Sequence, residues 1–321
     1  MKNKRILITG GAGFIGSHLC RFFLKNNYYV RAIDNYSTGN KSNIIDLFEN
    51  NNFEFLEGDI RDMSFCKSIC KNIDFISHQA ALGSVPRSIK DPINSNDVNV
   101  KGFLNVIFQA QKNKIKKFIY ASSSSVYGDN EDLPKRELMV GKPMSPYALT
   151  KSINEDYAEI FSKIYGLKTI GLRYFNVFGP NQDPNGPYAA VIPKFINQFL
   201  KNKSPVINGD GEFSRDFTYI KNVQLINLLA VESNNTSLFE VFNVACGKRI
   251  TINKVAYSIR ELLSKHDKNI LKIKILNGPN RVGDVPHSLA SISKAKDILK
   301  YYPNYNFDDG LKETIDWYCK E

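Results

Sequence analysis

The sequence of 321 residues lacks any apolar run of the roughly 18 residues that a membrane-spanning helix needs. Its first apolar stretch, Ile6–Ile8, is far shorter than the core of a signal peptide, and a glycine cluster follows it directly. A dense basic block with interleaved aromatic residues is also missing, although the formal net charge is +11. We therefore expect a cytoplasmic protein with no membrane and no nucleic-acid partner, whose mild positive field attracts anionic nucleotides.

Cysteine and histidine are too few and too scattered for a metal centre. The five cysteines are odd in number and form no disulfide framework. Cys66 and Cys70 are four residues apart and share a helix face, but no third or fourth ligand lies near them in the sequence. The four histidines show no metal-ligand spacing. We expect reduced thiols and no bound metal.

Short apolar runs alternate with longer helical patterns in the first half of the chain. The runs are continuously apolar, as in strands that helices cover on both faces, and the alternation is typical of parallel β-α-β units. The sequence predicts strands at Arg5–Thr9, Tyr29–Asp34, Phe53–Glu57, Phe75–Gln79, Lys117–Ser122 and Thr169–Tyr174, and helices at Phe14–Lys25, Val98–Asn113 and Pro146–Tyr165. The predicted fold is α/β, a doubly wound parallel sheet of the Rossmann type with a smaller C-terminal α/β lobe.

A glycine-rich turn follows the first predicted strand. Gly10, Gly13 and Gly16 allow a tight turn, close approach of the backbone to a pyrophosphate, and close packing of a helix on the sheet. The helix that begins there offers free N–H groups and the positive end of its dipole. Asp34 ends the second predicted strand, at the spacing expected for the carboxylate that binds an adenine ribose, where it would repel a 2′-phosphate. The pattern predicts NAD rather than NADP as the cofactor.

Tyr147 and Lys151 lie four residues apart on a predicted helix with clearly marked ends. Ser145 suits the N-cap, Pro146 the first helical position, and Gly166 the left-handed C-terminal position. An unperturbed tyrosine has a pKa near ~10, and an ammonium on the same helix face should lower it by favouring the phenolate. Such a pair can remove a hydroxyl proton while a hydride leaves the same carbon for a nicotinamide.

A serine run, Ser122–Ser125, ends the fifth predicted strand. Ligands of open α/β sheets bind at the carboxyl edge of the strands. A serine run is often only a polar loop, but this position predicts that at least one hydroxyl contacts the reacting oxygen. We therefore interpret the chain as an NAD-dependent enzyme with Tyr147 as its base and Lys151 as the group that holds and tunes that base.

Asparagine, glycine and proline cluster after about residue 176. The clusters Asn176–Pro187, Asn208–Gly211 and Asn277–Asp284 are typical of loops around a second lobe. We expect an NAD-binding domain at residues 1–176, which carries the reactive residues, and mainly a substrate-binding lobe at residues 177–321. The boundary is approximate, and the chain can cross between the two.

These motifs resemble the extended short-chain dehydrogenase/reductase family and, within it, the UDP-hexose 4-epimerases. The resemblance covers nearly the whole chain. It is carried by TGGAGFIG at residues 9–16, DNYSTG at 34–39, the Ser123 region before VYG at 126–128, RYFNVFG at 173–179, NGDG at 208–211, SRDF at 214–217, FN at 242–243 and RxxD at 281–284. Residues 81–87 and 182–193 are similar to the branch that prefers N-acetylated UDP-sugars in bacterial surface-polysaccharide pathways.

The resemblance implies reversible C4 epimerisation of a UDP-N-acetylhexosamine, UDP-GlcNAc or UDP-GalNAc, with UDP-glucose and UDP-galactose as further candidate substrates. It implies that Tyr147 takes the O4 proton while Ser123 is hydrogen-bonded to the same oxygen. The C4 hydride passes to NAD, the transient 4-keto sugar turns its other face, and the hydride returns. NAD is regenerated in each turnover and can stay bound.

The resemblance also implies two sets of binding residues. The cofactor set is Gly10, Gly13, Phe14, Ile15, Gly16, Asp34, Asn35, Ser37, Thr38, Gly39, Asp59, Ile60, Gln79, Ala80, Ala81, Asn99, Tyr147, Lys151 and Tyr174. The substrate set is Gly83, Ser84, Arg87, Ser123, Ser124, Tyr147, Asn176, Ala190, Val191, Asn208, Arg215, Asn243, Arg281, Asp284 and Ser288. In it, Arg215, Arg281 and Asn176 hold the diphosphate and sugar, and Asp284 the uridine ribose. Without the resemblance, a Gly-Asp turn explains Asp59 equally well.

Ser288 is the residue that bears on the choice of sugar. It matches the position at which epimerases restricted to glucose and galactose carry a tyrosine, and a serine leaves room for an acetamido group at C2. Gly83, Ser84 and Ser124 would line the same side of the sugar. The alternative is that Ser288 is simply a small loop residue.

Three other functions compete with epimerisation of an N-acetylhexosamine. A 4,6-dehydratase needs an Asp-Glu pair where this chain has Ser123 and Ser124, which argues against it. A UDP-glucuronate 4-epimerase or decarboxylase begins with the same oxidation and stays open. A non-catalytic NAD-binding regulator would most simply show a broken Tyr/Lys pair, and this pair is intact.

The resemblance also implies a homodimer that pairs through two helices of each subunit, one of them the helix of Tyr147. This helix offers an apolar surface, although it could equally pack on the protein's own sheet. Its members are Ile153, Tyr157, Ile160, Phe161 and Ile164.

Overall fold

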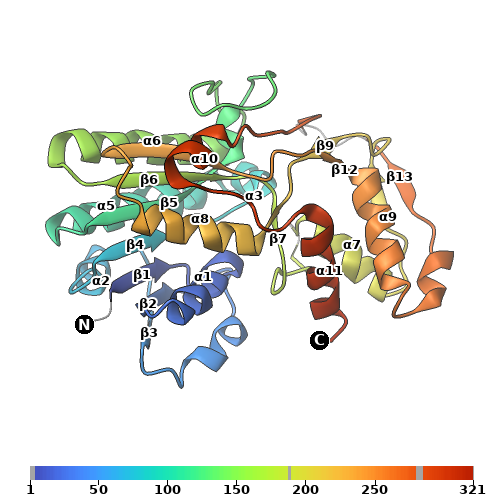
Figure 1. Cartoon of the computed structure of the whole chain (residues 1–321), viewed down its shortest axis with the longest axis horizontal. Coiled ribbons are helices and arrows are strands. Elements are labelled where there is room, and N and C mark those ends of the chain that lie inside the picture. Colours follow the sequence, from blue (N-terminus) through green and yellow to red (C-terminus); the bar gives the residue numbers. More distant parts are fainter. Residues whose placement is uncertain (1–3, 187–188, 280–284, 321) are drawn as a thin grey trace.

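The computed structural model of the chain describes residues 4–186, 189–279 and 285–320. A seven-stranded parallel sheet lies at its centre, in the spatial order β11-β6-β5-β4-β1-β2-β3 (Figure 1). Its strands are β1 (Arg5–Thr9), β2 (Tyr29–Asp34), β3 (Phe53–Glu57), β4 (Phe75–His78), β5 (Lys117–Ser123), β6 (Thr169–Tyr174) and β11 (Phe239–Val244). The predicted doubly wound parallel sheet is confirmed, and the six predicted strands end within one residue of the observed ones.

Helices cover both faces of this sheet. Side chains of α1 (Phe14–Lys25) and α8 (Ile220–Glu232) contribute to one apolar cluster, and those of α2 (Met63–Ile69), α5 (Phe103–Lys112) and α6 (Pro146–Tyr165) contribute to another. Because apolar side chains are buried on both faces, the strands are continuously apolar, as the sequence indicated.

The carboxyl ends of the strands lie along one edge of the sheet because all of them run in the same direction. Thr9 at the end of β1 pairs with His78 at the end of β4. Ser123 at the end of β5 pairs with Tyr174 at the end of β6. The glycine turn, the serine run and the segment after β6 therefore leave the sheet at the same edge.

Two helices test the sequence-based boundaries. Helix α6 begins and ends as predicted: Ser145 Oγ accepts a hydrogen bond from Ala148 N at 3.1 Å, and Gly166 has a left-handed φ of 68°. The predicted helix Val98–Asn113 instead divides into a π-helical turn, η3 (Asp97–Gly102), followed by α5. The π-turn lies close to the cavity described below. Single π-turns within α-helices are frequent at functional sites.

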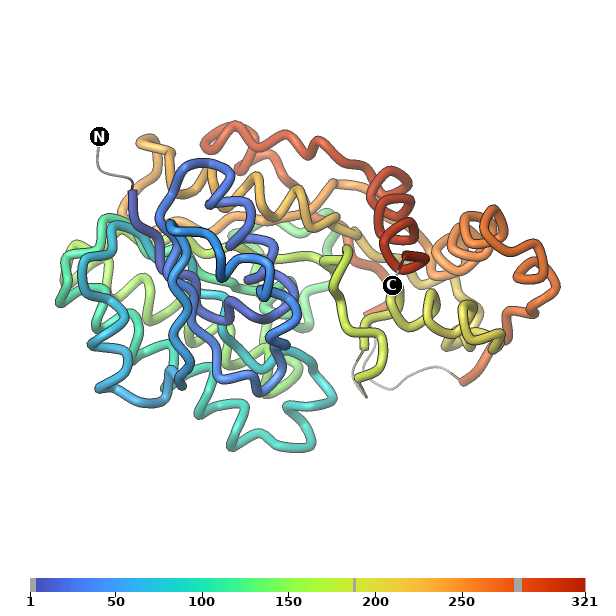
Figure 2. The backbone as a smooth tube through the Cα atoms, turned by 90° about the horizontal axis from the view of Figure 1, so that it is seen from below, coloured from blue at the N-terminus to red at the C-terminus, as the bar shows by residue number. Residues whose placement is uncertain are grey.

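The second lobe projects from one end of the sheet, as Figures 1 and 2 both show. Its helices α7 and α9 pack on each other, and α11 packs on α9. Small two-stranded sheets join β8 with β13, β9 with β12, and β7 with β10. The elements are β7 (Val177–Phe178), α7 (Val191–Leu200), β8 (Val206–Asn208), β9 (Ser214–Arg215), β10 (Thr218–Tyr219), β12 (Ile250–Thr251), α9 (Ile252–Leu263), β13 (Leu276–Gly278) and α11 (Phe307–Tyr318).

Between these elements the chain returns to the central sheet. Strand β11 pairs with β6 along its whole length, and α8 covers the neighbouring strands. The buried Lys117 of β5 attaches α8 firmly, because its ammonium donates to the carbonyl oxygens of Ala230 at 3.2 Å and Val231 at 2.6 Å, and also to that of Ser233. A cation at a helix C-terminus is favourable because the unpaired carbonyls and the dipole are negative there.

The remaining helices are short, and the longest of them, α10, contacts β11. They are η1 (Lys41–Asn43), η2 (Ile45–Leu47), α3 (Val85–Lys90), α4 (Pro92–Asn96), η4 (Ser124–Tyr127), η5 (Lys268–Lys272) and α10 (Ser293–Leu299). Among the described residues, no helix is long and apolar enough to cross a membrane. The same part of the chain contains no group of three or more His, Cys, Asp and Glu side chains that could hold a metal ion.

Candidate active site

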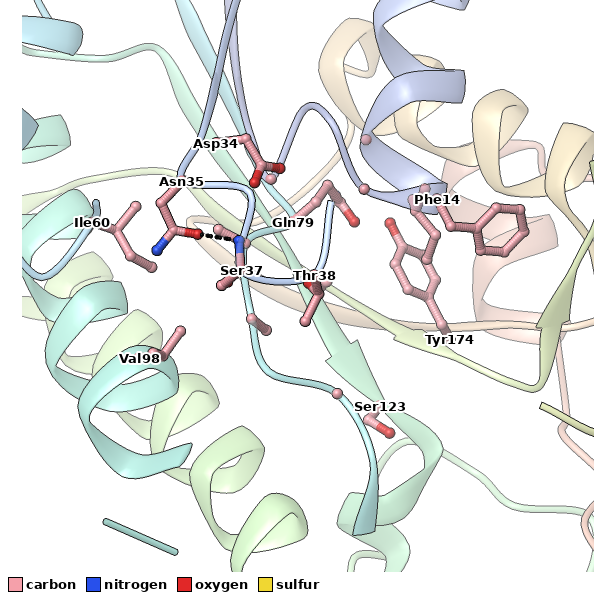
Figure 3. Close-up of a pocket in the computed structure, with 18 of the residues that line it drawn as sticks. Phe14, Asp34, Asn35, Ser37, Thr38, Ile60, Gln79, Val98, Ser123 and Tyr174 are labelled. Carbon is pink, nitrogen blue, oxygen red and sulfur yellow. Dashed lines mark hydrogen bonds between the residues drawn. The ribbon is translucent and has the colours of Figure 1, made fainter. Parts of the chain in front are cut away.

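A cavity of about 370 Å³ opens at the carboxyl edge of the sheet (Figure 3). The structure brings together 17 of the 19 predicted cofactor residues on its wall. They are Gly10, Gly13, Phe14, Ile15, Gly16, Asp34, Asn35, Ser37, Thr38, Asp59, Ile60, Gln79, Ala80, Ala81, Tyr147, Lys151 and Tyr174. The cavity wall therefore joins the predicted dinucleotide turn to the predicted base. We call it the dinucleotide cavity.

The glycine turn has the shape that a pyrophosphate requires. Gly10 has a left-handed φ of 67°, and its carbonyl accepts a hydrogen bond from Gly13 N at 3.1 Å. A Cβ atom at Gly16 would lie 2.0 Å from the Gly10 carbonyl oxygen, so any other residue would push α1 away from the turn. The free N–H groups at the start of α1 are thus held close to the cavity, and these residues fit a bound dinucleotide.

Asp34 is anchored by the backbone beside this turn. Its Oδ2 accepts from Ala12 N at 3.0 Å and its Oδ1 from Tyr36 N at 2.8 Å. Burial raises the pKa of Asp34, while these backbone hydrogen bonds lower it. Each carboxylate oxygen keeps a further lone pair. The geometry suits the predicted pairing with ribose hydroxyls.

Polar contacts brace the wall beside Asp34. Asn35 Oδ1 accepts from Ser37 N at 3.0 Å (Figure 3), and Asn35 Nδ2 donates to Asp59 Oδ2 at 2.8 Å. The Arg61 guanidinium lies 2.7 Å from Asp59 Oδ2 and holds the pKa of this carboxyl at about 2. Asp59 is therefore an ionised brace, and the neighbouring Ile60 supplies apolar wall.

Two predicted cofactor residues, Gly39 and Asn99, are not on the cavity wall, and their direct contact with the cofactor stays a prediction. A Cβ at Gly39 would lie 2.9 Å from Asp34 Oδ2, so Gly39 leaves space for that carboxylate. Asn99 is buried and clamps the backbone of Leu82: its Oδ1 accepts from Leu82 N at 2.8 Å and its Nδ2 donates to Leu82 O at 3.1 Å. Both residues shape the wall from outside.

Several wall residues were not predicted as cofactor or substrate ligands. They are Ile33, Gly58, Val98, Ala121, Ser122 and Val177. Most of them lie next to a predicted residue at the end of a strand, so the carboxyl-edge rule could have found them. Val98 lies in the π-turn η3, which the helical pattern of the sequence does not reveal.

Tyr147 and Ser123 meet on the wall of the dinucleotide cavity. Burial raises the pKa of Tyr147, and a hydrogen bond with Ser123 lowers it. The first turn of α6 is fixed by a hydrogen bond from Tyr147 N to Ser88 Oγ at 3.0 Å. Ser123 Oγ also accepts from Ser125 N at 3.1 Å. The two hydroxyls predicted to meet one substrate oxygen are therefore adjacent.

Lys151 is buried beside them and is held by the sheet. Its ammonium donates to the Ala121 carbonyl at 2.7 Å and lies 6.0 Å from the centre of the Tyr147 ring. Burial lowers the pKa of Lys151 to about 8, and the charge of Glu155 raises it. Burial of the phenol dominates the pKa of Tyr147 in this structure, and its lowering by Lys151 stays a prediction.

A buried ion pair supports this part of the cavity. Arg173 binds Glu155 bidentately, with Nη2 at 2.7 Å from Oε2 and Nε at 2.9 Å from Oε1. Ser122, next to Ser123, donates its hydroxyl hydrogen to Glu155 Oε1. Arg173 Nη1 also donates to the Tyr127 hydroxyl at 3.0 Å. The Glu155 carboxylate, which contacts the serine run, is therefore paired with the Arg173 guanidinium.

A second cavity, of about 820 Å³, lies toward the second lobe. Of the predicted substrate residues, Ser84, Ala190, Val191 and Asn208 line it, whereas Gly83, Ser123, Tyr147 and Asn176 line the dinucleotide cavity. The consecutive residues Gly83 and Ser84 thus lie on the walls of the two cavities.

The predicted diphosphate and specificity residues are only partly placed. Arg215 is half-buried, and its Nη1 donates to Ser214 O at 3.0 Å and to Pro286 O at 3.1 Å. Ser288 N donates to Ser214 O at 3.0 Å, which puts Ser288 beside the strand of Arg215. Arg281 and Asp284 lie outside the described residues.

Arg87, Ser124 and Ser288 are half-buried and stand outside the walls of the cavities described above. The predicted substrate contact of Asn243 needs a correction. This residue is fully buried: its Oδ1 accepts from the Tyr127 hydroxyl at 2.6 Å, and its Nδ2 donates to Lys135 O at 2.9 Å and Ser291 O at 3.0 Å. With its side chain fully used inside the protein, Asn243 cannot reach a substrate as predicted.

Comparison with known proteins agrees with this site. Residues 6–245 match the model of the "NAD dependent epimerase/dehydratase family". A "Putative UDP-glucose 4-epimerase" of Methanocaldococcus jannaschii is 38% identical over 314 residues, which cover 97% of each chain.

Two solved structures extend the comparison. The UDP-N-acetylglucosamine 4-epimerase of Methanobrevibacter ruminantium M1, in complex with UDP-N-acetylmuramic acid, has a TM-score of 0.92 and 42% identity over 100% of this chain and 99% of that one. The UDP-glucuronic acid 4-epimerase of Bacillus cereus, in complex with UDP-glucuronic acid and NAD, has a TM-score of 0.89 and 31% identity over 98% of this chain and 99% of that one.

Proposed function

The chain belongs to the NAD dependent epimerase/dehydratase family, and we propose that it catalyses the reversible C4 epimerisation of UDP-GlcNAc and UDP-GalNAc. One observation carries the proposal: Tyr147, Lys151 and Ser123 line the same cavity as the glycine turn and Asp34. A base on the wall of a dinucleotide cavity is the arrangement that removal of a hydroxyl proton and a hydride from one carbon requires.

Each of the three residues has a distinct part in this proposal. Bound NAD supplies the hydride acceptor and gives the hydride back within one turnover. Tyr147 takes the O4 proton of the sugar and later returns it, and Ser123 orients the same oxygen through its hydroxyl. Lys151, fixed by the Ala121 carbonyl, places a positive charge beside the phenol when it is protonated. The charge favours the phenolate that forms during the reaction.

The polar surroundings favour epimerisation over dehydration. A dehydratase must remove a proton and a hydroxyl from neighbouring carbons, and this needs a free acid and base. The carboxylate in contact with the serine run is that of Glu155, and it is paired bidentately with Arg173. A carboxylate held in this way is a poor proton donor, since the guanidinium favours its ionised form.

Preference for the N-acetylated sugar is proposed from Ser288. A tyrosine there should fill the space proposed for the acetamido group. The variant Ser288→Tyr is expected to lower kcat/KM for UDP-GlcNAc about tenfold or more and to leave that for UDP-glucose within about twofold, since one steric clash of this size costs a kcal/mol or more. Steady-state rates with both sugars check this. Equal loss or equal retention of the two activities would contradict the specificity role.

The function itself is tested by incubating the purified protein with UDP-GlcNAc, without added NAD, and following the anomeric signals of the sugar by NMR. We expect the signals of UDP-GalNAc to appear. Parallel samples receive UDP-glucose and UDP-glucuronate. Turnover of UDP-glucuronate alone, by epimerisation or with release of CO₂, would move the assignment to the alternative that the Bacillus cereus relative represents. If none of these sugars is converted, only a non-catalytic NAD-binding role would remain for the protein.

We also propose that the protein is a homodimer that pairs through α6. Leu149, Ile160 and Ile164 have exposed fractions of 50%, 46% and 68% and lie along one stripe of this helix. Phe161, for which packing on the protein's own sheet was the alternative, is buried in that way. Light scattering should show two chains for the wild type and one for Ile164→Glu. Leu271→Glu, on an apolar residue of η5 with an exposed fraction of 54%, is the control and should stay dimeric.

A further inference from the structure

A buried chain of hydrogen bonds links α8 to the wall of the dinucleotide cavity. Asn227 of α8 is fully buried; its Nδ2 lies 2.9 Å from the Tyr174 hydroxyl and 2.9 Å from the Val223 carbonyl oxygen. Its Oδ1 lies 3.0 Å from Ser77 Oγ, and Gln79 Nε2 lies 3.0 Å from the same hydroxyl. Gln79 and Tyr174 line the cavity, and their polar ends point toward one another in Figure 3.

The carbonyl of Val223 fixes the direction of these bonds. A backbone carbonyl only accepts, so the Asn227 amide must present Nδ2 to it and Oδ1 to Ser77. The Oδ1 atom also only accepts, so the Ser77 hydroxyl must donate its single hydrogen to it. Ser77 Oγ is then left to accept, and Gln79 must use its Nε2 for this contact.

Gln79 and Tyr174 consequently present opposite hydrogen-bonding groups at the cavity, an acceptor and a donor. Gln79 Oε1 is buried, and no partner within the described residues meets normal hydrogen-bond geometry; burial raises the pKa of the Tyr174 phenol, and a weaker side-chain contact with Gln79 lowers it. The Gln79 Oε1 atom can only accept, and an acceptor buried in this way gains from a donor brought by a ligand. The Tyr174 oxygen accepts from Asn227 Nδ2, so its own hydrogen is left for Gln79 Oε1 or for a ligand.

We propose that Asn227 is a positioning residue for NAD. Through Ser77 and directly, it holds Gln79 as an acceptor and Tyr174 as a donor toward the nicotinamide riboside half, whose hydroxyl and amide groups carry both kinds of partner. This inference rests on the proposed function, because NAD must lie with its nicotinamide near Tyr147. It also assigns a cofactor role to α8, which lies beyond the residues that form the cavity wall.

The test measures the dissociation constant of NAD by calorimetry, on protein freed of copurified NAD. Asn227→Leu keeps the branched skeleton of the side chain but removes both polar ends, and we expect it to raise Kd about tenfold or more. Ser77→Ala frees the Gln79 amide and Asn227 Oδ1 but leaves the contact between Asn227 and Tyr174, and it should raise Kd about fivefold. In a Tyr174→Phe background, Asn227→Leu should raise the NAD Kd by a smaller factor than it does in the wild type, since one of the two oriented groups is already gone.

Asn222→Leu is the matched control. Asn222 is also fully buried on α8, and its side chain binds Tyr305 O at 2.7 Å and Asn304 N at 3.0 Å, away from the cavity. We expect a fall in the unfolding temperature similar to that of Asn227→Leu, but an NAD Kd within about twofold of the wild type.

Two outcomes would overturn the proposal. One is an unchanged Kd in both Ser77→Ala and Asn227→Leu; the other is an equal rise in Asn222→Leu, which would mean that Kd follows stability alone. If Asn227→Leu does not fold, Ser77→Ala decides the question, since it removes one buried oxygen and adds no bulk. A wild type that binds no NAD and converts no UDP-sugar would refute the proposed function instead, whereas normal turnover with unaffected variants would refute only this inference.

Discussion

The variant Tyr147→Phe is expected to lower kcat by about 10²–10⁴-fold, the range typical of removing a general acid–base group. Phenylalanine keeps the ring that lines the cavity and removes only the hydroxyl that would exchange the O4 proton. The Kd of NAD should therefore change little. Single-turnover rates with UDP-GlcNAc, together with an NAD titration, separate the loss of chemistry from a loss of cofactor.

Tyr165→Phe provides the matched control for this variant. Tyr165 ends the same helix and has an exposed fraction of 51%, so removal of its hydroxyl should leave kcat within about twofold. Ser123→Ala should lie between the two, because it removes one hydrogen bond to the reacting oxygen and leaves the base in place. A Tyr147→Phe enzyme that keeps a tenth or more of its rate would rule out the role of Tyr147 as the base.

Local signals in the sequence predicted most of the fold that positions this site. The ends of α6 depend on Ser145, Pro146 and Gly166, whose preferences act within one helical turn. The glycine turn depends on Gly10 and Gly16, where backbone crowding permits no Cβ. Each of these features requires a residue type that can be read without any knowledge of tertiary structure.

Non-local contacts account for what the sequence did not predict. Strand β11 joins the sheet by pairing with β6, which lies some 65 residues earlier, and no local pattern selects that partner. Asn243 lies at the end of the same strand, and its burial follows from segments around Tyr127 and Ser291 that close over it. A motif can mark such a residue as important without showing whether it binds a ligand or holds the fold.

The pKa of Tyr147 also depends on non-local contacts that the sequence does not reveal. Helical spacing correctly placed Tyr147 and Lys151 on one face of α6, but the effect of an ammonium depends on distance and burial. The Ala121 carbonyl holds the Lys151 ammonium 6.0 Å from the ring centre, and burial raises the pKa of the phenol. Neither this separation nor the burial of the phenol follows from the four-residue spacing of the pair.

The second large effect is expected for stability, at the ion pair beneath the serine run. Glu155→Ala leaves the Arg173 guanidinium buried without its counter-charge, and breaking a buried pair in this way typically costs about 3–5 kcal/mol. The side chains of Arg173 and Glu155 are exposed by only 4% and 11%. Urea unfolding should show the loss as a lower midpoint with an unchanged slope.

Glu159→Ala, one turn further along α6, provides the control. Glu159 pairs with Lys163 on the surface, where the side chains are exposed by 40% and 70%, and such pairs contribute about 0–1 kcal/mol. The double variant Glu155→Leu with Arg173→Met separates two explanations of a large loss. If the cost is that of an uncompensated charge, removing both charges should restore much of the stability, since apolar replacements of buried pairs are often neutral. If the double variant is as unstable as Glu155→Ala, the hydrogen bonds that Arg173 and Glu155 make to Tyr127 and Ser122 are what hold this part of the cavity together.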